Sequence, residues 1–218
     1  MKTLLISPHF DDAVLSAGQY MAGMKTKCDV LTVFSEIPKD KGLQTPYDAS
    51  CGFNSSEDAM VVRRQEDEAA LAILGANSLH LGLLDSQYPG GSSKDDVLQA
   101  LRQFNSDFGS QYDMILAPLG LRHPDHINVS WAANTVFGLS KHPAFYMWED
   151  LPHRVTHPEE VQERLDLIRT LQEPELTFIG DGPMADKVRA LWCYTSQMAK
   201  GDLNPYVLYV PERFWKIS

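Results

Sequence analysis

Short apolar runs alternate with longer amphipathic stretches along the whole chain. The short runs are too apolar for surface helices and predict buried strands at residues 2–7, 29–35, 78–83, 114–118, 144–148 and 176–179. The longer stretches predict helices at residues 13–24, 57–74, 94–108, 125–139, 158–171 and 184–200. Strands and helices that alternate in this way are typical of βα units. The pattern therefore predicts an α/β fold, with one domain over residues 1–218 in which helices flank a mostly parallel sheet.

Local signals refine three parts of this pattern. Ser55 and Ser93 precede predicted helices as N-caps do, and Gly75 follows a helix as a C-cap glycine does. The tail at residues 206–215 alternates aromatic and polar residues, which predicts an added strand at a sheet edge. Residues 37–56 have no clear period and form an unusually long connection, so a substrate lid and plain disorder are both open.

Composition and charge narrow the class of protein. The chain has 218 residues, 44% of them hydrophobic, and a domain of this size holds a core without disulfide or metal staples. Its net charge of −10 would repel nucleic acid and anionic membrane surfaces, so we expect neither as a partner. Three widely spaced cysteines suit a reducing compartment, and the apolar start is too short for a signal peptide. We therefore expect a cytoplasmic protein, while its oligomeric state stays open.

Chemically active side chains follow the first and the fourth predicted strands. The sequence His-Phe-Asp-Asp occupies residues 9–12, and His-Pro-Asp-His occupies residues 123–126. Because ligands collect at the carboxyl ends of parallel strands, on one edge of the sheet, we expect the two motifs to meet there. Each motif taken alone is also explained as the capped start of a helix. The two together favour a catalytic site.

Two histidines and one carboxylate in these motifs form a candidate zinc site. Residues three apart across a strand-to-helix corner can point to one place, so His9 and Asp12 can share a divalent ion. His126 completes a set of three ligands, and three protein ligands with an open fourth position are the pattern of catalytic zinc. Zinc is the expected cofactor, although such sites also accept other first-row ions such as Fe²⁺.

The remaining polar residues of the motifs suit catalysis beside the ion. Asp11 is left free to act as a general base that takes a proton from zinc-activated water. His123 can donate a proton to a leaving amine or, as imidazolium, stabilise an oxyanion, and Asp125 can tune it. This constellation predicts metal-assisted hydrolysis of an amide or ester.

Further segments follow the order of motifs in one enzyme family. Besides the two motifs, they lie at residues 63–66, 81–85, 146–152 and 196–197. With them the chain resembles the zinc-dependent N-deacetylases of the PIG-L or LmbE-like family. The resemblance implies a Rossmann-like fold and removal of acetyl from an N-acetylated amino sugar, free or carried on a larger molecule. It implies the same ligand, base and assisting roles, and substrate contacts at Arg63 and Asp85.

Four positions depart from the family pattern. Phe10 stands where a proline is usual and Ala13 where a glutamate is common, but neither is a ligand or the base. Leu121 and Arg122 stand where some members carry tyrosine and glycine. A phenol that helps to polarise the carbonyl in those relatives is therefore absent from that position, so their substrates alone are no safe guide to the substrate of this chain.

Two other interpretations stay open. The first is a binding module of the same fold that has lost turnover, which the missing tyrosine supports and the intact Asp11 and His123 oppose. The second is a nucleotide enzyme, which is weakened because no Gly-x-Gly-x-x-Gly follows the first strand. We expect structural or surface positions for the histidines without a partner at ligand spacing, which are His80, His142, His153 and His157.

Overall fold

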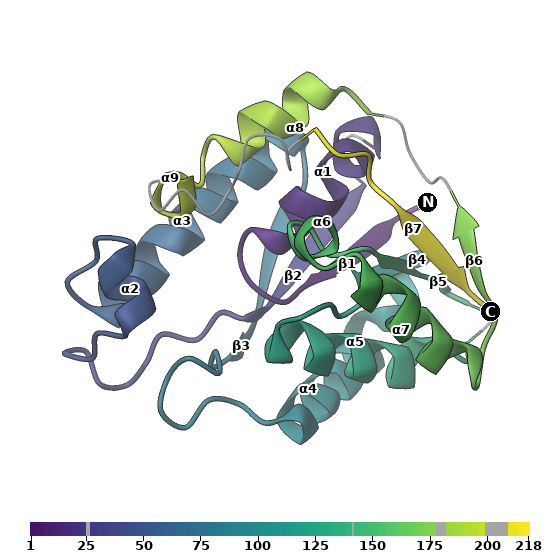
Figure 1. Cartoon of the computed structure of the whole chain (residues 1–218), viewed down its shortest axis with the longest axis horizontal. Helices are drawn as coiled ribbons and strands as arrows, with labels where there is room; N and C mark the ends of the chain where they lie inside the picture. The colour runs from purple at the N-terminus through teal and green to yellow at the C-terminus, as the bar shows by residue number, and fades with distance from the viewer. Residues whose placement is uncertain (25–26, 141, 178–181, 199–208) are drawn as a thin grey trace.

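The chain forms a mostly parallel seven-stranded sheet flanked by helices, as the computed structural model in Figure 1 shows. The structure describes residues 1–24, 27–140, 142–177, 182–198 and 209–218. The strands are β1 (Thr3–Ser7), β2 (Cys28–Phe34), β3 (Asn77–Leu83), β4 (Met114–Pro118), β5 (Ala144–Trp148), β6 (Pro174–Thr177) and β7 (Phe214–Ile217). The fold class predicted from the sequence is confirmed.

The sheet has its topological switch point between β1 and β4. The strand order is β3-β2-β1-β4-β5-β7-β6. β1 pairs in parallel with β2 on one side and with β4 on the other, and the parallel pairing continues to β3 and β5. In doubly wound sheets, ligands bind beyond the carboxyl ends of the strands where the order reverses. The two strands that meet at this point are the ones followed by the two motifs.

Helices cover both faces of the sheet. They are α1 (Asp12–Met24), α2 (Pro46–Ser50), α3 (Ser56–Leu74), α4 (Lys94–Phe108), α5 (Pro124–Phe137), α6 (His153–Thr156), α7 (Glu159–Arg169), α8 (Met184–Leu191) and α9 (Thr195–Met198), with a 3₁₀ turn at Gly109–Gln111. The helices α1, α3 and α8 pack on one face, and α4, α5 and α7 lie on the other (Figure 1). Each face therefore has its own apolar core.

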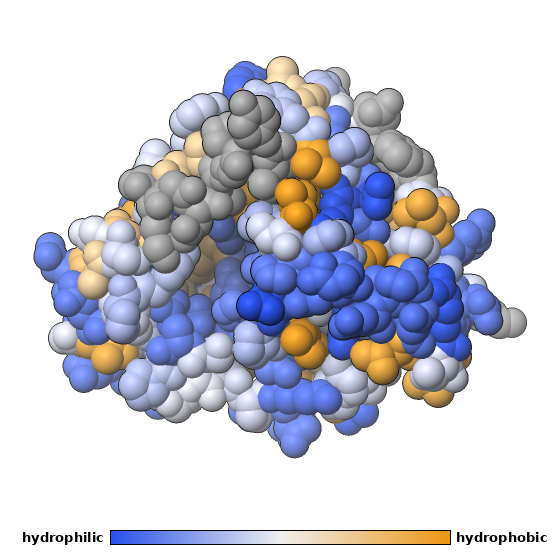
Figure 2. All heavy atoms as spheres, viewed as in Figure 1, coloured by the Kyte–Doolittle hydropathy of each residue, from blue (hydrophilic) through white to orange (hydrophobic). Residues whose placement is uncertain are grey.

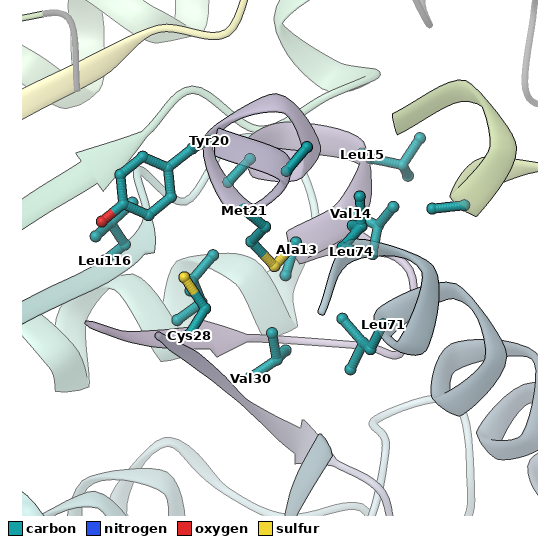
Figure 3. Packing of buried hydrophobic residues seen from close by; sticks show 14 of the residues in the cluster. Ala13, Val14, Leu15, Tyr20, Met21, Cys28, Val30, Leu71, Leu74 and Leu116 are labelled. Carbon is teal, nitrogen blue, oxygen red and sulfur yellow. The ribbon is translucent and has the colours of Figure 1, made fainter. Parts of the chain in front are cut away.

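The central strand β1 contributes to both cores because its side chains alternate between the faces. Leu5 belongs to the core under α1 and α3, whereas Leu4 and Ile6 belong to the core under α4 and α5. Figure 3 shows the first of these cores, in which Val14 of α1 and Leu74 of α3 pack together above the sheet. Full burial of side chains of this size stabilises the fold by about 1.5–3 kcal/mol each.

The predicted helix caps are present. The Ser55 hydroxyl accepts the Asp58 backbone N–H at the start of α3, and Gly75 ends that helix in a left-handed conformation with φ 68°. Ser93 forms a capping box with Asp96 at the start of α4. These are local interactions, which explains why the sequence signals located them within a residue or two.

The C-terminal region differs from the sequence prediction. The helix predicted at residues 184–200 is divided into α8 and α9, and residues 199–200 lie outside the described part of the chain. The tail was predicted as an edge strand, but β7 lies between β5 and β6, so that prediction is wrong. Phe214 and Ile217 of β7 are buried, and the short β6, which opens with Pro174, forms the edge. Residues 206–208 of the predicted strand are not among those described.

The long connection at residues 37–56 contains the short helix α2. Thr45 caps α2 by accepting the Asp48 backbone N–H at 3.0 Å. The Asp48 side chain is fully buried and accepts hydrogen bonds from the Ser56 hydroxyl at 2.7 Å and from the Tyr88 hydroxyl at 3.2 Å. A buried carboxylate with several partners anchors this segment to the domain.

None of the described helices is long and apolar enough to cross a membrane. Hydrophilic residues cover most of the face in Figure 2, and hydrophobic residues appear there in small separate groups. Scattered apolar residues of this kind are normal on a protein surface.

A buried ion pair stabilises α1 at a point where the helix is interrupted. The helix loses its regular geometry at Ala17, which has φ −140° and ψ 21°. The backbone N–H groups of Gln19 and Tyr20 then donate to the Glu212 carboxylate at 2.8 and 3.0 Å. The same carboxylate pairs with Lys187 Nζ at 2.8 Å, and the two side chains are only 4% and 0% exposed. Glu212 therefore caps the second half of α1 and balances a charge in the core.

We expect Glu212→Gln to lower the free energy of unfolding by about 3–5 kcal/mol, because Lys187 would lie in the core without its counter-ion. Urea unfolding followed by circular dichroism measures this loss. The matched control is Asp166→Asn, which removes an exposed ion pair with Arg169 and should cost at most about 1 kcal/mol. Equal losses in the two variants would contradict the role of the buried pair.

Candidate active site

The corner between β1 and α1 holds His9 and Asp12 beside each other. The Ser7 hydroxyl donates to the His9 carbonyl at 2.6 Å and accepts the Ala13 N–H at 3.0 Å, which fixes the path of the chain. The His9 backbone N–H donates to Asp12 Oδ2 at 2.8 Å. Asp12 is the first residue of α1, where the free amides and the helix dipole favour a carboxylate.

The corner between β4 and α5 is a tight turn with two left-handed residues. Gly120 has φ 86° and Arg122 has φ 62°. A Cβ at Gly120 would lie 2.5 Å from the Cβ of Ser130, so both the conformation and the space require glycine. His123 is the N-cap of α5, and its Nδ1 accepts the Asp125 backbone N–H at 3.3 Å. This turn directs His123 and the first turn of α5 toward the β1 corner.

The two corners meet, and they bring His9, Asp12 and His126 together. Asp12 Oδ2 lies 3.2 Å from His9 Nδ1 and 3.2 Å from His126 Nε2. Zinc–nitrogen and zinc–oxygen bonds of roughly 2.0–2.2 Å in a tetrahedron separate ligand atoms by about 3.3–3.5 Å. The two imidazole nitrogens and the carboxylate oxygen all lie within 4.8 Å of one another, so they could hold a zinc ion. Their role as ligands stays a prediction.

A second group of side chains shares His9. One nitrogen of His9, one of His123 and an Asp125 oxygen also lie within 4.8 Å of one another. Asp125 Oδ2 is 3.2 Å from His9 Nε2 but 4.0 Å from His123 Nδ1. The Asp125 side chain is therefore closer to His9 than to the histidine that it was expected to tune.

Opposite charges shift the pKa values in this cluster. Burial opposes protonation of His126, but Asp12 and Asp150 outweigh it and raise the pKa of His126 to about 9. Burial also disfavours the ionised carboxyl of Asp12, yet the charges of His126 and His9 hold its pKa well below the usual range. Burial and the two nearby histidines lower the pKa of His123 to about 4. His123 is therefore a neutral imidazole near pH 7.

Asp11 lies in the same pocket with a perturbed carboxyl group. Burial and the negative charge of Asp12 raise the pKa of Asp11 to about 6, while the charge of His9 opposes the shift. A carboxylate with a pKa near the working pH is suited to accept and return a proton. The expected general base is thus beside the candidate zinc ligands.

A cavity of about 510 Å³ opens onto these groups, and its volume is typical of small-molecule sites. Five of the six histidines and aspartates of the two motifs line it, Asp125 being the exception. Arg63 and Asp85 also belong to its polar lining. Another part is apolar or aromatic and consists of Phe10, Leu15, Phe34, Tyr47, Met60, Pro152 and Tyr194. The remaining lining residues are Gln87, His153 and Gln197.

Both residues expected to contact a substrate line this cavity, and both already have protein partners. Arg63 Nη2 pairs with Asp48 Oδ1 at 2.9 Å, and the guanidinium lies 5.2 Å from the Tyr47 ring and 5.5 Å from the Phe53 ring. The Asp85 carboxylate accepts hydrogen bonds from the backbone and the side chain of Gln87. Arg63 therefore also holds the segment at residues 37–56 against the pocket.

Three residues near the candidate site were not singled out from the sequence. Asp150 Oδ1 lies 2.7 Å from His126 Nδ1, and its place in the family segment at residues 146–152, just after β5, was the available signal. His153, expected to be structural, lines the pocket with its ring centroid 5.2 Å from that of His126. Tyr194 also lines the pocket and hydrogen-bonds Asp67 Oδ1 at 2.8 Å. Only the folded chain brings these residues to the motifs.

Known proteins resemble this chain in sequence and structure. A 2'-N-acetylparomamine deacetylase from Streptomyces fradiae is 27% identical over 227 residues, which cover 90% of this chain and 73% of the relative. The crystal structure of an A40926 pseudoaglycone deacetylase is 25% identical with a TM-score of 0.69, and covers 100% of this chain and 97% of that one. The zinc-inhibited form of a teicoplanin deacetylase shares the fold, with a TM-score of 0.78, 21% identity and coverage of 100% and 98%.

The family match covers the two motifs and the strands that carry them. The GlcNAc-PI de-N-acetylase family, PIG-L, matches residues 4–137, which is more than half of the 218 residues. The matched region begins in β1 and ends with α5, so it contains the switch point and both corners of the candidate site. The chain belongs to the PIG-L family of GlcNAc-PI de-N-acetylases.

Proposed function

We propose that this protein is a zinc-dependent N-deacetylase that removes the acetyl group from an N-acetylated amino sugar or a conjugate of one. The observation that carries the proposal is the meeting of the two corners, where Asp11 lies in one pocket with the His9, Asp12 and His126 cluster. A candidate base next to a candidate metal site is the arrangement that hydrolysis of an amide needs. The deacetylases among the similar proteins support this reaction class.

His9, Asp12 and His126 would hold the zinc ion. Zinc bound by these groups supplies a Lewis acid that polarises the amide carbonyl and lowers the pKa of water. The donor set suits several first-row ions, so Fe²⁺ is the alternative occupant. Because the pKa of His126 is raised to about 9, the ligand must lose a proton before it binds a cation, and metal affinity rises with pH.

Asp11 acts as the general base. Its carboxylate takes the proton of the attacking water and delivers it to the leaving nitrogen, so the proton is returned within one turnover. The pKa of about 6 that burial and Asp12 give to this carboxyl places it close to neutral pH. With this pKa, the Asp11 carboxylate can both accept the proton from water and release it to the leaving nitrogen.

His123 stabilises the tetrahedral intermediate as a hydrogen-bond donor. Its Nδ1 accepts the Asp125 backbone N–H, so the ring proton of the neutral imidazole resides on Nε2. Because the pKa of His123 is lowered to about 4, the ring is not an imidazolium near neutral pH. The sequence suggests proton donation to the amine or stabilisation of the oxyanion by an imidazolium, whereas the lowered pKa of His123 favours a neutral ring that donates a hydrogen bond to the oxyanion.

The pocket selects the sugar with polar and apolar walls. Arg63 and Asp85 contact the sugar or its substituent, and the aromatic and apolar lining residues cover the remainder of the substrate. The 2'-N-acetylparomamine deacetylase among the relatives points to N-acetylated aminoglycoside-like compounds as the first substrates to test. A binding module without turnover would have no use for Asp11 as a free base, so this alternative is not favoured.

We expect the zinc-loaded protein to release acetate from 2'-N-acetylparomamine or from an N-acetylglucosamine conjugate. Removal of metal with a chelator should abolish release, because the carbonyl loses its Lewis acid, and about one equivalent of zinc should restore it. An enzymatic acetate assay on a panel of N-acetylated sugars measures both effects. Full activity in metal-free protein, or tight sugar binding without acetate, would contradict the proposal.

We expect Asp11→Asn to lower kcat by about 10²–10⁴-fold, because the amide cannot accept the proton of water. The zinc content should stay unchanged, since His9, Asp12 and His126 are intact. Acetate release and metal analysis on the same samples separate the two effects. Asp107→Asn, an exposed change on α4, is the control and should keep both properties. Retention of most of the activity in Asp11→Asn would exclude Asp11 as the base.

A further inference from the structure

Each imidazole of the candidate zinc site has a carboxylate behind it. His126 turns Nε2 toward Asp12, and its other nitrogen, Nδ1, lies 2.7 Å from Asp150 Oδ1. His9 turns Nδ1 toward Asp12, and its Nε2 lies 3.2 Å from Asp125 Oδ2. The first of these carboxylates comes from the end of β5 and the second from the start of α5, so different parts of the chain provide the same arrangement.

Asp150 can act on His126 only as an acceptor. Its second oxygen, Oδ2, accepts the backbone N–H groups of Gly120 at 2.9 Å and Leu121 at 3.4 Å. These donors belong to the tight turn before His123, so the carboxylate is fixed on both sides and is 1% exposed. The ionised form, which accepts at both oxygens, fits this environment. The proton between the two side chains therefore belongs to His126 Nδ1, so Nε2 is the nitrogen that must be deprotonated to bind a cation beside Asp12.

Asp125 has the same relation to His9. Its side chain is fully buried, and Oδ2 accepts the Ser86 backbone N–H at 3.3 Å in addition to facing His9 Nε2. His123 is 4.0 Å away, and its Nδ1 already accepts the Asp125 backbone N–H. His9 Nε2 thus donates its proton in a hydrogen bond to Asp125. Because a protonated nitrogen cannot bind a metal, a second cation between His9, His123 and Asp125 is disfavoured.

We propose that Asp150 and Asp125 are positioning residues that fix the tautomers of His126 and His9, so that each ring presents an unprotonated nitrogen to the metal. This proposal rests on the proposed metal-binding role of those histidines. A metal-bound histidine that donates its other N–H to a carboxylate is oriented and made more basic by that bond, and loss of the partner typically costs about 10–100-fold in metal affinity.

The substitution Asp150→Asn should reverse the tautomer of His126. The two N–H groups of Gly120 and Leu121 select the amide oxygen, which turns the amide NH₂ toward His126. His126 Nδ1 must then accept, and its proton moves to Nε2, where it blocks the nitrogen that faces Asp12. At Asp125 the amide oxygen can stay opposite His9, but it accepts more weakly than a carboxylate. Asp150→Asn should therefore be the more severe change.

The test measures zinc affinity rather than turnover. Competition with a chromophoric chelator gives the Kd for zinc in the wild type, in Asp150→Asn and in Asp125→Asn, and we expect losses of about 10–100-fold in both variants. Cobalt substitution gives a second readout, because the visible spectrum of Co²⁺ reports a change of ligand geometry. Urea midpoints for each variant show whether the protein remains folded.

The matched control is Glu149→Gln. Glu149 is the neighbour of Asp150, is equally buried, and pairs with Arg154 at 3.0 Å, but makes no contact with either histidine in the described structure. It should lose stability and keep zinc affinity within about twofold of the wild type. A control that weakens zinc as much as Asp150→Asn would show that destabilisation alone explains the loss, and would overturn the proposal.

The outcomes separate this proposal from the proposed function. If either variant binds zinc within about twofold of the wild type, the tautomer role of that carboxylate is overturned, whether or not the enzyme is active. If the wild type binds zinc tightly, the variants bind it weakly and no acetate is released from any substrate, the positioning role stands and the proposed function fails.

Discussion

The candidate site depends on a single carboxylate oxygen, Oδ2 of Asp12. It accepts the backbone N–H of His9 at 2.8 Å and lies 3.2 Å from a ring nitrogen of His9 and from one of His126. The first two contacts are made within the β1 corner, whereas His126 arrives from the corner after β4. The hydrogen bonds between β1 and β4 set the distance at which the two corners meet. The site therefore exists only as long as these central strands keep their register.

When no cation is bound, protons on the histidines of the candidate site balance the negative charges of the buried aspartates. Desolvation alone would make His9 and His126 neutral, but the surrounding aspartates raise the pKa of both rings. The positive imidazoles in turn keep Asp12 ionised. A divalent ion bound at this place would replace the protons as the source of positive charge, and its uptake would release them.

The parts of this structure that could be predicted from the sequence rest on contacts between near neighbours. Ser55 and Gly75 mark the ends of a helix because their hydrogen bonds reach three or four residues, and the two motifs stand out because each follows a strand. Asp150 stood out only as part of the family segment at residues 146–152, since its partner His126 is brought to it by the pairing of β4 with β5. The inner position of β7 was missed for a similar reason. Alternation of polar and apolar residues does not reveal that the short β6 lies beyond it.

The ion pair between Arg63 and Asp48 has a consequence for electrostatic selectivity. Arg63 is the one arginine or lysine in the lining of the described cavity. Its charge is balanced by the fully buried Asp48, and its guanidinium lies over two aromatic rings. The same lining contains Asp11, Asp12 and Asp85. Even a single bound divalent cation would leave the cavity with little net attraction for phosphorylated or carboxylated ligands. Compounds that carry ammonium groups would instead be drawn toward this acidic lining.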